Sequence, residues 1–372
     1  MEMNISGGYV SADGHVVEPA DLWTTRMDKR FRERAPRIEA GRKGDFYIIE
    51  GLAPFPVGFD GAAVNSRAEG KAMQTHFEFA DTRPGAFDAK ARLADQDLDH
   101  VRAEVIYPGI VGMVGYATPD AEYYREIARV YNDWMGEFSA EAPDRLLGVG
   151  LLPIRGPVEW IIEEAERVAK KGLRSVMLPI EVPGMYGRLK DSDRLWAALQ
   201  DLDLPVAFHV ATSATEEETP KVERLGVAVG LIEQKICTGE RGLCDVIYAG
   251  IPQAFPKLRF ILAEGGIGWI AAVLRLMDHW WEDHRGWMQP RLEEPPSTYF
   301  LRQFWATFED DRAGLLTREL LNVDHLMWGS DYPHTEGVFP FSRERIAKDF
   351  ADIPEDETLK IIGGNASQLY GL

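Results

Sequence analysis

The sequence predicts an α/β fold, a (β/α)8 TIM barrel, and three observations support this prediction. Short apolar runs alternate with amphipathic helical patterns, which is typical of a parallel sheet covered by helices. The runs number eight, as a closed barrel of this type requires. Several of them end in His, Asp or Glu, at the strand ends where the chemistry of barrel enzymes collects. An open doubly wound sheet is the alternative that this pattern leaves.

The length and composition fit one large globular unit. The chain has 372 residues, of which 45% are hydrophobic and 10% aromatic, so it can bury a large core. One barrel-sized domain or two ordinary domains would fit this length. We expect a single barrel domain over residues 1–372.

The eight expected strands are apolar runs that stop at polar or turn-forming residues. The first run stops at Asp13, and the second stops at Pro108 and Gly109. In chain order the runs cover residues 9–13, 103–107, 147–154, 175–182, 205–210, 258–264, 304–308 and 325–331. Helical patterns lie between them at residues 92–100, 157–171, 193–202 and 268–284, and the tail at 354–370 has the apolar spacing of a closing helix.

Residues 22–87 do not follow this repeat. They are rich in Gly, Pro and charge, and residues 45–51 resemble a further β-strand. An insertion after the first strand begins at the catalytic end of a barrel, so it could cover the mouth as a lid. A peripheral excursion that packs against the barrel or a second subunit explains it equally well.

The charge of the chain limits its partners. A formal net charge of -19 disfavours nucleic acid and anionic membranes, because both require clustered Lys and Arg. No run of about 18 apolar residues occurs, and the N-terminal sequence lacks the features of a signal peptide. We therefore expect a cytoplasmic protein that acts on a small molecule.

Polar side chains at the expected strand ends form the candidate site. Asp13 and His15 are two residues apart, so on a strand they face the same side. His209, Glu264 and Asp331 end the fifth, sixth and eighth runs. Two imidazoles with two or three carboxylates suit Zn²⁺ or Mn²⁺, with a coordination position left for water or substrate.

Each of these residues also has an ordinary structural explanation. A single strand-end His is usually a hydrogen-bonded structural residue, and an Asp before a turn is usually a turn residue or a helix cap. Glu264 could stand at a helix entry. His334 could orient Asp331 or a bound substrate, or serve only the turn that contains it. The joint placement of these groups at four strand ends favours a shared metal site.

Six segments together resemble the amidohydrolase superfamily, and more narrowly its aminocarboxymuconate-semialdehyde-decarboxylase-like branch. They are Ser11–Pro19, Arg92–Asp97, Phe255–Arg259, Ala263–Trp269, Trp328–His334 and Gly364–Ala366. The resemblance spans nearly the whole chain in the right order. It implies a distorted (β/α)8 barrel with one divalent metal, usually zinc and sometimes manganese, in an enzyme that is commonly a dimer. We accordingly expect a homodimer or a higher homo-oligomer.

Transferred residue by residue, the resemblance implies Asp13, His15, His209 and Asp331 as metal ligands. Two departures stand out. Asp13 occupies a position where family members often have the first His of a His-x-His pair, and Glu264 follows the sixth strand, where the decarboxylases place a histidine. The second departure weakens the case for decarboxylation.

Three functions therefore stay open, in this order. The first is a metal-dependent hydrolase of a small cyclic or aromatic substrate, with Asp331, Glu264 and His209 as catalytic residues. In it, Asp331 accepts the proton of a water that the metal activates. The second is a nonoxidative decarboxylase of an aromatic or unsaturated acid, in which Glu264 must supply the proton. The third is a non-catalytic barrel scaffold.

Overall fold

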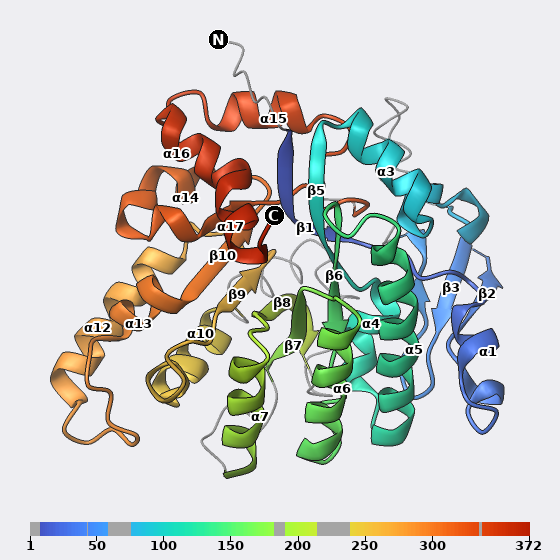
Figure 1. The fold of residues 1–372 in the computed structure, drawn as a ribbon, viewed down its shortest axis with the longest axis horizontal. Helices are drawn as coiled ribbons and strands as arrows, with labels where there is room; N and C mark the ends of the chain where they lie inside the picture. Colours follow the sequence, from blue (N-terminus) through green and yellow to red (C-terminus); the bar gives the residue numbers. More distant parts are fainter. Residues whose placement is uncertain (1–7, 43, 59–75, 182–189, 214–238, 335–336) are drawn as a thin grey trace.

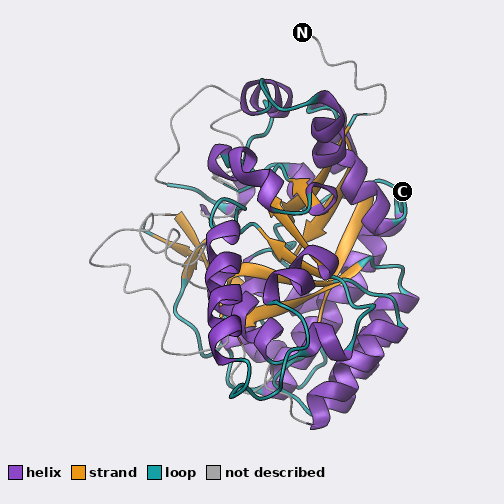
Figure 2. Ribbon diagram, turned by 90° about the vertical axis from the view of Figure 1, so that its left-hand side faces the viewer, coloured by secondary structure: helices purple, strands orange, loops and turns teal. Residues whose placement is uncertain are grey.

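The computed structural model describes residues 8–42, 44–58, 76–181, 190–213, 239–334 and 337–372. Within them, eight strands form one sheet in the order β1-β5-β6-β7-β8-β9-β10-β11. The neighbours pair in parallel along this order, and the backbone N–H of Asp331, just beyond β11, donates to the Asp13 carbonyl of β1 at 2.9 Å. The sheet thus curls into a nearly closed barrel, and Figure 2 shows helices enclosing it. The predicted (β/α)8 fold is confirmed.

All eight predicted strands are present. They are β1 (Tyr9–His15), β5 (Val101–Tyr107), β6 (Leu146–Leu151), β7 (Ser175–Glu181), β8 (Val206–Ser213), β9 (Phe260–Ala263), β10 (Phe304–Phe308) and β11 (Leu326–Trp328). The predicted ends of the sixth and eighth strands were too late. The backbone turns to a positive φ at Glu264 (58°) and Asp331 (51°), so these residues lie in the turns that follow the strands.

The helices lie around the barrel in the expected alternation (Figure 1). The larger ones are α3 (Ala89–Leu98), α5 (Ala121–Ala140), α6 (Val158–Lys170), α7 (Lys190–Asp201), α10 (Gly239–Tyr248), α12 (Ile270–His284), α13 (Pro296–Gln303) and α15 (Ser342–Asp349). Shorter ones are α1 (Leu22–Arg26), α4 (Ile110–Val114), α11 (Ile251–Ala254), α14 (Arg312–Thr317), α16 (Glu355–Leu359) and α17 (Asn365–Tyr370). The predicted closing helix is divided into α16 and α17, because Gly363 has a non-helical backbone between them.

The sequence analysis missed α5, although it is 20 residues long. Its start carries a recognisable signal, because the Asp120 side chain accepts hydrogen bonds from the backbone N–H groups of Glu122 and Tyr123. Its inner face is dominated by buried aromatic residues, among them Tyr123, Tyr124 and Trp134. The core therefore continues from the barrel strands into this helix.

The insertion begins with α1 and continues with a small antiparallel sheet. This sheet has the order β2-β3-β4, from β2 (Arg37–Gly41), β3 (Gly44–Ile48) and β4 (Phe55–Pro56). The predicted strand at 45–51 is confirmed as β3. Near these elements Arg26 pairs with Glu137 at 2.8 Å and Arg30 with Glu122 at 3.0 Å, both on the outer side of α5. We therefore propose a peripheral role for residues 22–50, while residues 59–75 lie outside the described ones.

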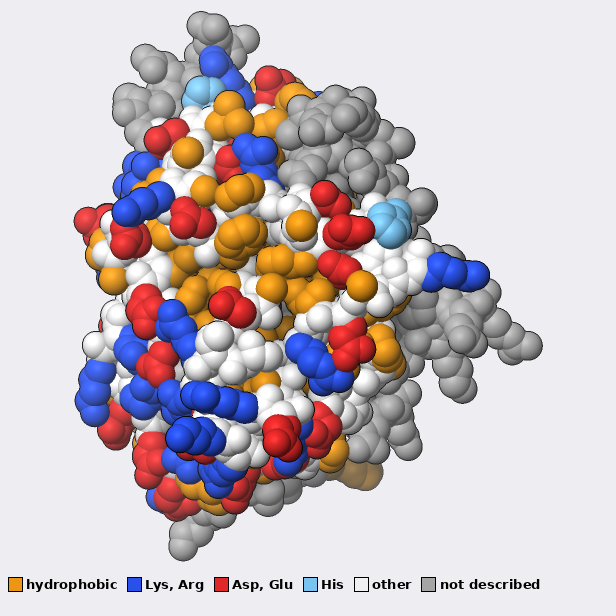
Figure 3. Space-filling model, turned by 90° about the vertical axis from the view of Figure 1, so that its right-hand side faces the viewer, with side chains coloured by type: hydrophobic (Ala, Val, Ile, Leu, Met, Phe, Trp, Pro, Cys, Tyr) orange, Lys and Arg blue, Asp and Glu red, His pale blue; other side chains and the backbone are white. Residues whose placement is uncertain are grey.

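The face of the molecule that carries this insertion is shown in Figure 3, where basic and acidic side chains are interspersed around a central group of hydrophobic ones. Among the residues that the structure describes, no helix is both long and apolar enough to cross a membrane.

Candidate metal centre

β1 brings the first two candidate ligands to one side of the strand. Asp13 and His15 are both fully buried, and Oδ1 of Asp13 lies 3.7 Å from Nε2 of His15. Gly14, between them, is required by packing, because a Cβ at this position would collide with Oε1 of Glu104. Glu104 is itself fixed by a buried ion pair with Arg92 at 2.7 Å, and Arg92 also donates to the His15 carbonyl at 2.9 Å. Arg92 and Glu104 thus hold the Asp-Gly-His triplet in place.

β8 contributes His209 from across the barrel. Its side chain is fully buried, and its Nε2 lies 3.6 Å from Oδ1 of Asp13 and 3.4 Å from Oε2 of Glu264. Four ligands about 2.1 Å from one ion in a tetrahedron stand about 3.4 Å apart. The separations around His209 are close to this value.

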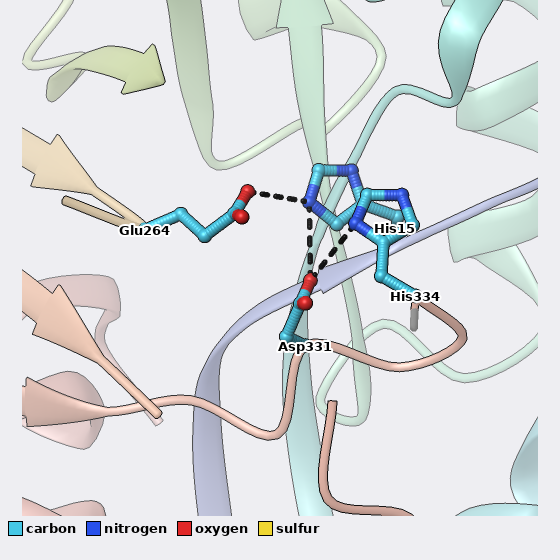
Figure 4. Close-up of side chains that lie close together, drawn as sticks. All are labelled: His15, Glu264, Asp331 and His334. Carbon is cyan, nitrogen blue, oxygen red and sulfur yellow. Dashed lines mark ion pairs between the residues drawn. The ribbon is translucent and has the colours of Figure 1, made fainter. Parts of the chain in front are cut away.

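Glu264 and Asp331 approach the same point from the turns after β9 and β11. Oε2 of Glu264 and Oδ1 of Asp331 lie 3.8 and 3.6 Å from Nε2 of His15. Figure 4 shows the four side chains of His15, Glu264, Asp331 and His334 pointing toward one another. A positive φ at a non-glycine residue is unfavourable and persists where the surrounding structure imposes it, often at functional sites. The surrounding structure therefore holds the backbone of Glu264 and of Asp331 in this unfavourable conformation.

The two histidines are oriented by backbone carbonyls. Nδ1 of His15 lies 2.8 Å from the Pro108 carbonyl, and Nδ1 of His209 lies 2.9 Å from the Val210 carbonyl. A carbonyl only accepts hydrogen bonds, so each Nδ1 carries the hydrogen and each Nε2 of a neutral ring presents its lone pair to the cluster. This is the tautomer that a metal-binding histidine requires.

The electrostatics of the two rings differ. Burial, with the neighbouring His334 and His209 rings, holds the pKa of His15 well below its usual range. Burial also lowers the pKa of His209, but attraction by Asp13 and then by Glu264 outweighs it, and the net pKa is raised. His15 is therefore a neutral ring that can donate its Nε2 lone pair to a metal, whereas the pKa of His209 depends on the carboxylates beside it.

Three polar atoms at the centre of the cluster fit a divalent cation. Nε2 of His15, Nε2 of His209 and Oδ1 of Asp13 are buried and make no hydrogen bond to any residue that the structure describes. Buried polar atoms are normally paired, so three of them facing one point indicate a missing partner. Their chemistry, two imidazole nitrogens and a carboxylate oxygen, is that of a Zn²⁺ or Mn²⁺ site.

The structure brings all the predicted site residues together. Two groups have potential ligand atoms within 4.8 Å of one another, namely Asp13, His15 and His209, and a second group of His15, Glu264, Asp331 and His334. His334 stacks on the His15 ring, with centroids 3.9 Å apart, and its Nδ1 lies 3.0 Å from Oδ1 of Asp331. This position suits the orienting role, which is one of the two roles that the sequence leaves open for His334.

The sequence analysis missed two residues that contact the cluster. The Tyr107 ring, at the end of β5, lies 4.8 Å from the His209 ring. The Thr307 hydroxyl of β10 donates to Oδ2 of Asp13 at 2.8 Å. A signal for Thr307 was available, because a hydroxyl inside an apolar and largely buried strand must find a polar partner.

A parallel barrel with imidazoles and carboxylates gathered at one rim defines a class of barrel enzymes that bind a metal ion. Comparison with known proteins identifies the member of this class. A model of the amidohydrolase family matches residues 48–372. The chain therefore belongs to the amidohydrolase family and is an enzyme, as the sequence resemblance implied.

Two curated relatives cover most of the chain. The 2-amino-3-carboxymuconate-6-semialdehyde decarboxylase of Dictyostelium discoideum is 22% identical over 304 residues, which are 79% of either chain. The gamma-resorcylate decarboxylase of Rhodococcus jostii (strain RHA1) is 26% identical over 343 residues, covering 81% of this chain and 98% of the relative.

Solved structures agree with the fold. An amidohydrolase from Mycobacterium avium subsp. paratuberculosis K-10 superimposes with a TM-score of 0.80 at 20% identity, covering 99% of both chains. A dihydroxybenzoic acid decarboxylase from Polaromonas sp. JS666, solved with bound manganese and the inhibitor 2-nitroresorcinol, has a TM-score of 0.65 at 17% identity, covering 98% of this chain and 97% of that one.

Proposed function

We propose that this enzyme is a metal-dependent, nonoxidative decarboxylase of an aromatic or unsaturated carboxylic acid. The observation that carries the proposal is the position of Glu264. Its carboxylate belongs to the cluster, yet its side chain is 7% exposed, whereas those of Asp13, His15, His209 and Asp331 are fully buried. Glu264 is thus the site carboxylate that an entering substrate can contact, and the curated relatives are decarboxylases.

In this proposal Asp13, His15, His209 and Asp331 hold one divalent cation. The cation, when bound, lends positive charge to the substrate carboxylate and to a neighbouring hydroxyl group. The resemblance makes Zn²⁺ the first expectation. The carboxylate-rich ligand set and the manganese in the Polaromonas structure support Mn²⁺ as the alternative.

Glu264 is the proton donor of the proposed reaction. It transfers its proton to the ring carbon that bears the carboxylate, so a C–H bond forms there. The bond from this carbon to the carboxylate then breaks, its electron pair returns to the ring, and CO₂ leaves. Solvent reaches Glu264 and restores its proton for the next turnover.

Hydrolysis of a small organic substrate, the first expectation from the sequence, becomes the second candidate. The pairing of Asp331 with His334 at 3.0 Å supports it, because an aspartate and an imidazole can take up and pass on the proton of an attacking water. The comparisons favour decarboxylation, since the activities named for both curated relatives are decarboxylations.

Product analysis separates these candidates. Metal-loaded protein is incubated with 2,6-dihydroxybenzoate, 5-carboxyvanillate, lactones and amides in ¹⁸O-labelled water. Release of CO₂ from a carboxylic acid, with no ¹⁸O in the phenolic product, supports the proposal. Incorporation of ¹⁸O into a product carboxylate selects the hydrolase, and a protein with neither turnover nor bound metal is the scaffold.

The role of Glu264 is tested by hydrogen exchange. A decarboxylase that accepts a phenolic product should exchange the proton of the reacting ring carbon with D₂O, because this is the reverse of the protonation step. Glu264→Gln should keep the metal and slow both exchange and turnover by about 10²–10⁴-fold. Glu282→Gln on the exposed side of α12 is the matched control and should behave as wild type. Loss of metal in Glu264→Gln would instead make Glu264 a ligand.

A further inference from the structure

We propose that Thr307 is a positioning residue that makes Asp13 a metal ligand through one oxygen and couples it to the turn of Glu264. This inference rests on the metal site of the proposed function and is independent of whether the reaction is a decarboxylation. Thr307 lies in β10, a strand that supplies none of the predicted ligands, and its side chain is fully buried.

The direction of the hydrogen bonds at Thr307 is fixed by chemistry. The backbone N–H of Glu264 donates to Oγ1 of Thr307 at 2.7 Å. An N–H group cannot accept, so the hydroxyl accepts there and its own hydrogen is left for a second partner. That partner is Oδ2 of Asp13, 2.8 Å away. Two consecutive hydrogen bonds therefore link the backbone of Glu264 through the Thr307 hydroxyl to the Asp13 carboxylate.

The hydrogen bond from Thr307 distinguishes the two carboxylate oxygens of Asp13. Oδ2 receives the Thr307 hydroxyl, whereas Oδ1 makes no hydrogen bond to any described residue and lies 3.7 and 3.6 Å from the Nε2 atoms of His15 and His209. Oδ1 is thus directed at the cation position and Oδ2 away from it. We infer that Asp13 binds the metal through Oδ1 alone.

The same segment of chain also holds the far side of the Glu264 turn. Asp311, three residues after β10, accepts hydrogen bonds from the backbone N–H groups of Ile267 and Gly268, both at 2.7 Å. Thr307 and Asp311 together hold the turn through hydrogen bonds to its first and last residues. Held in this way, Glu264 keeps its unfavourable positive φ of 58°. β10 and the turn after it therefore set the relative positions of a ligand and the proposed acid.

The alternative is a threonine that only satisfies its own buried hydroxyl. Such a residue would affect the stability of the fold but not the way in which Asp13 meets the metal. The two explanations therefore differ in metal affinity and in ligand geometry, neither of which depends on turnover.

Two variants test the inference. Thr307→Val keeps the shape and removes the hydroxyl, whereas Thr307→Ser keeps the hydroxyl. Metal affinity is measured by competition with a chelating dye, ligand geometry by the visible spectrum of the Co²⁺-loaded protein, and folding by thermal unfolding of the metal-free protein. Thr307→Val should bind metal about 10–100-fold more weakly, as loss of such a supporting contact typically does, and should change the Co²⁺ spectrum. Thr307→Ser should resemble wild type in both.

Wild-type affinity and spectrum in Thr307→Val, or equal losses in both variants, would overturn the inference while leaving the metal site in place. A crystal structure of the metal-loaded wild type tests it without any variant. It should show Oδ1 of Asp13 on the ion and Oδ2 on Thr307, and bidentate binding by Asp13 would contradict it. Failure of the wild type to bind metal at all would overturn the metal site and this inference together.

Discussion

Histidines lie beside carboxylates both at the barrel rim and on α12, and of these two described regions we propose only the rim as a metal site. At the barrel rim, His15 and His209 are fully buried and their Nδ1 atoms contact backbone carbonyls of Pro108 and Val210. On α12, His279 has a side chain that is 58% exposed and lies 3.8 Å from Asp283 of the same helix. The residue types are alike, but the α12 pair is exposed to solvent, whereas Nε2 of His15, Nε2 of His209 and Oδ1 of Asp13 are buried and make no hydrogen bond to any described residue.

This difference shows that burial and support from other elements, not composition, make a metal site here. The rim cluster draws its groups from β1, β8 and the turns after β9 and β11, so the whole barrel must fold to assemble it. The α12 pair needs only one helix.

His209→Ala should remove the bound metal and with it all activity, because the variant loses one of the two imidazole ligands of the proposed site. His279→Ala is the matched control and should keep wild-type metal content. Plasma mass spectrometry of both purified variants measures the effect. Equal metal content in the two variants would show that the buried and the exposed histidine do not differ in the way proposed.

Asp331→Asn should reduce turnover by about 10²–10⁴-fold, because an amide can neither take up a proton nor neutralise the metal charge. The fold should persist, since the backbone N–H of residue 331 still donates to the Asp13 carbonyl. Steady-state kinetics and circular dichroism check the two parts separately. Wild-type kinetics in this variant would remove Asp331 from the proposed site.

Gly14→Ala should destabilise the protein by about 1–3 kcal/mol, because the new methyl group collides with a Glu104 side chain that Arg92 holds in place. Gly286→Ala, just beyond α12, meets no atom within 4 Å and should change stability by less than about 0.5 kcal/mol. Urea unfolding in the presence of a chelator measures both. A neutral Gly14→Ala variant would show that the support beneath the rim is adaptable.

Asp99 offers a buried carboxylate outside the cluster. Burial raises its pKa to about 6, although the Ser342 hydroxyl and backbone N–H both donate to it. The folded protein therefore holds this proton more tightly than the unfolded chain, in which the pKa is near 3.8. Its contribution to stability is complete below about pH 4 and is lost as the pH rises through 6.

Replacing this group tests that contribution. Wild-type stability should carry a falling component of about 1 kcal/mol per pH unit between pH 4 and 6, and Asp99→Asn should lack it. Denaturant unfolding of the metal-free proteins across this range measures the difference. Parallel pH profiles for the two proteins would show that Asp99 titrates normally.

Much of the fold was predictable because the described barrel strands are mostly buried and read as largely apolar runs. The residues Asp13, His15, His209 and Asp331 were predictable for a related reason, since a polar group that ends such a run needs a partner. The positive φ at Glu264 and Asp331 was not, because it depends on contacts from β10 and β1 rather than on local sequence.

Thr307 could be recognised in the sequence as a buried hydroxyl that needs a partner, but its partners could not be predicted. Its letter fits an ordinary β-strand, and its partners lie 43 and 294 residues away in the chain, at Glu264 and Asp13. The sequence did not predict which activity the site performs, because the resemblance implies a histidine where this chain has Glu264, and a carboxylate at this position suits both chemistries. The partly exposed position of Glu264 and the decarboxylase relatives together put decarboxylation ahead of hydrolysis in our proposal.

The central claim is that one divalent cation binds among Asp13, His15, His209 and Asp331. The most direct test is an anomalous-scattering map of crystals grown from protein purified without added metal, recorded at the zinc and manganese absorption edges. If the cation binds here, the map should contain a single peak within about 2.3 Å of Nε2 of His15, of Nε2 of His209 and of Oδ1 of Asp13. A map with no peak there, or with its metal at His279 on α12, would contradict it.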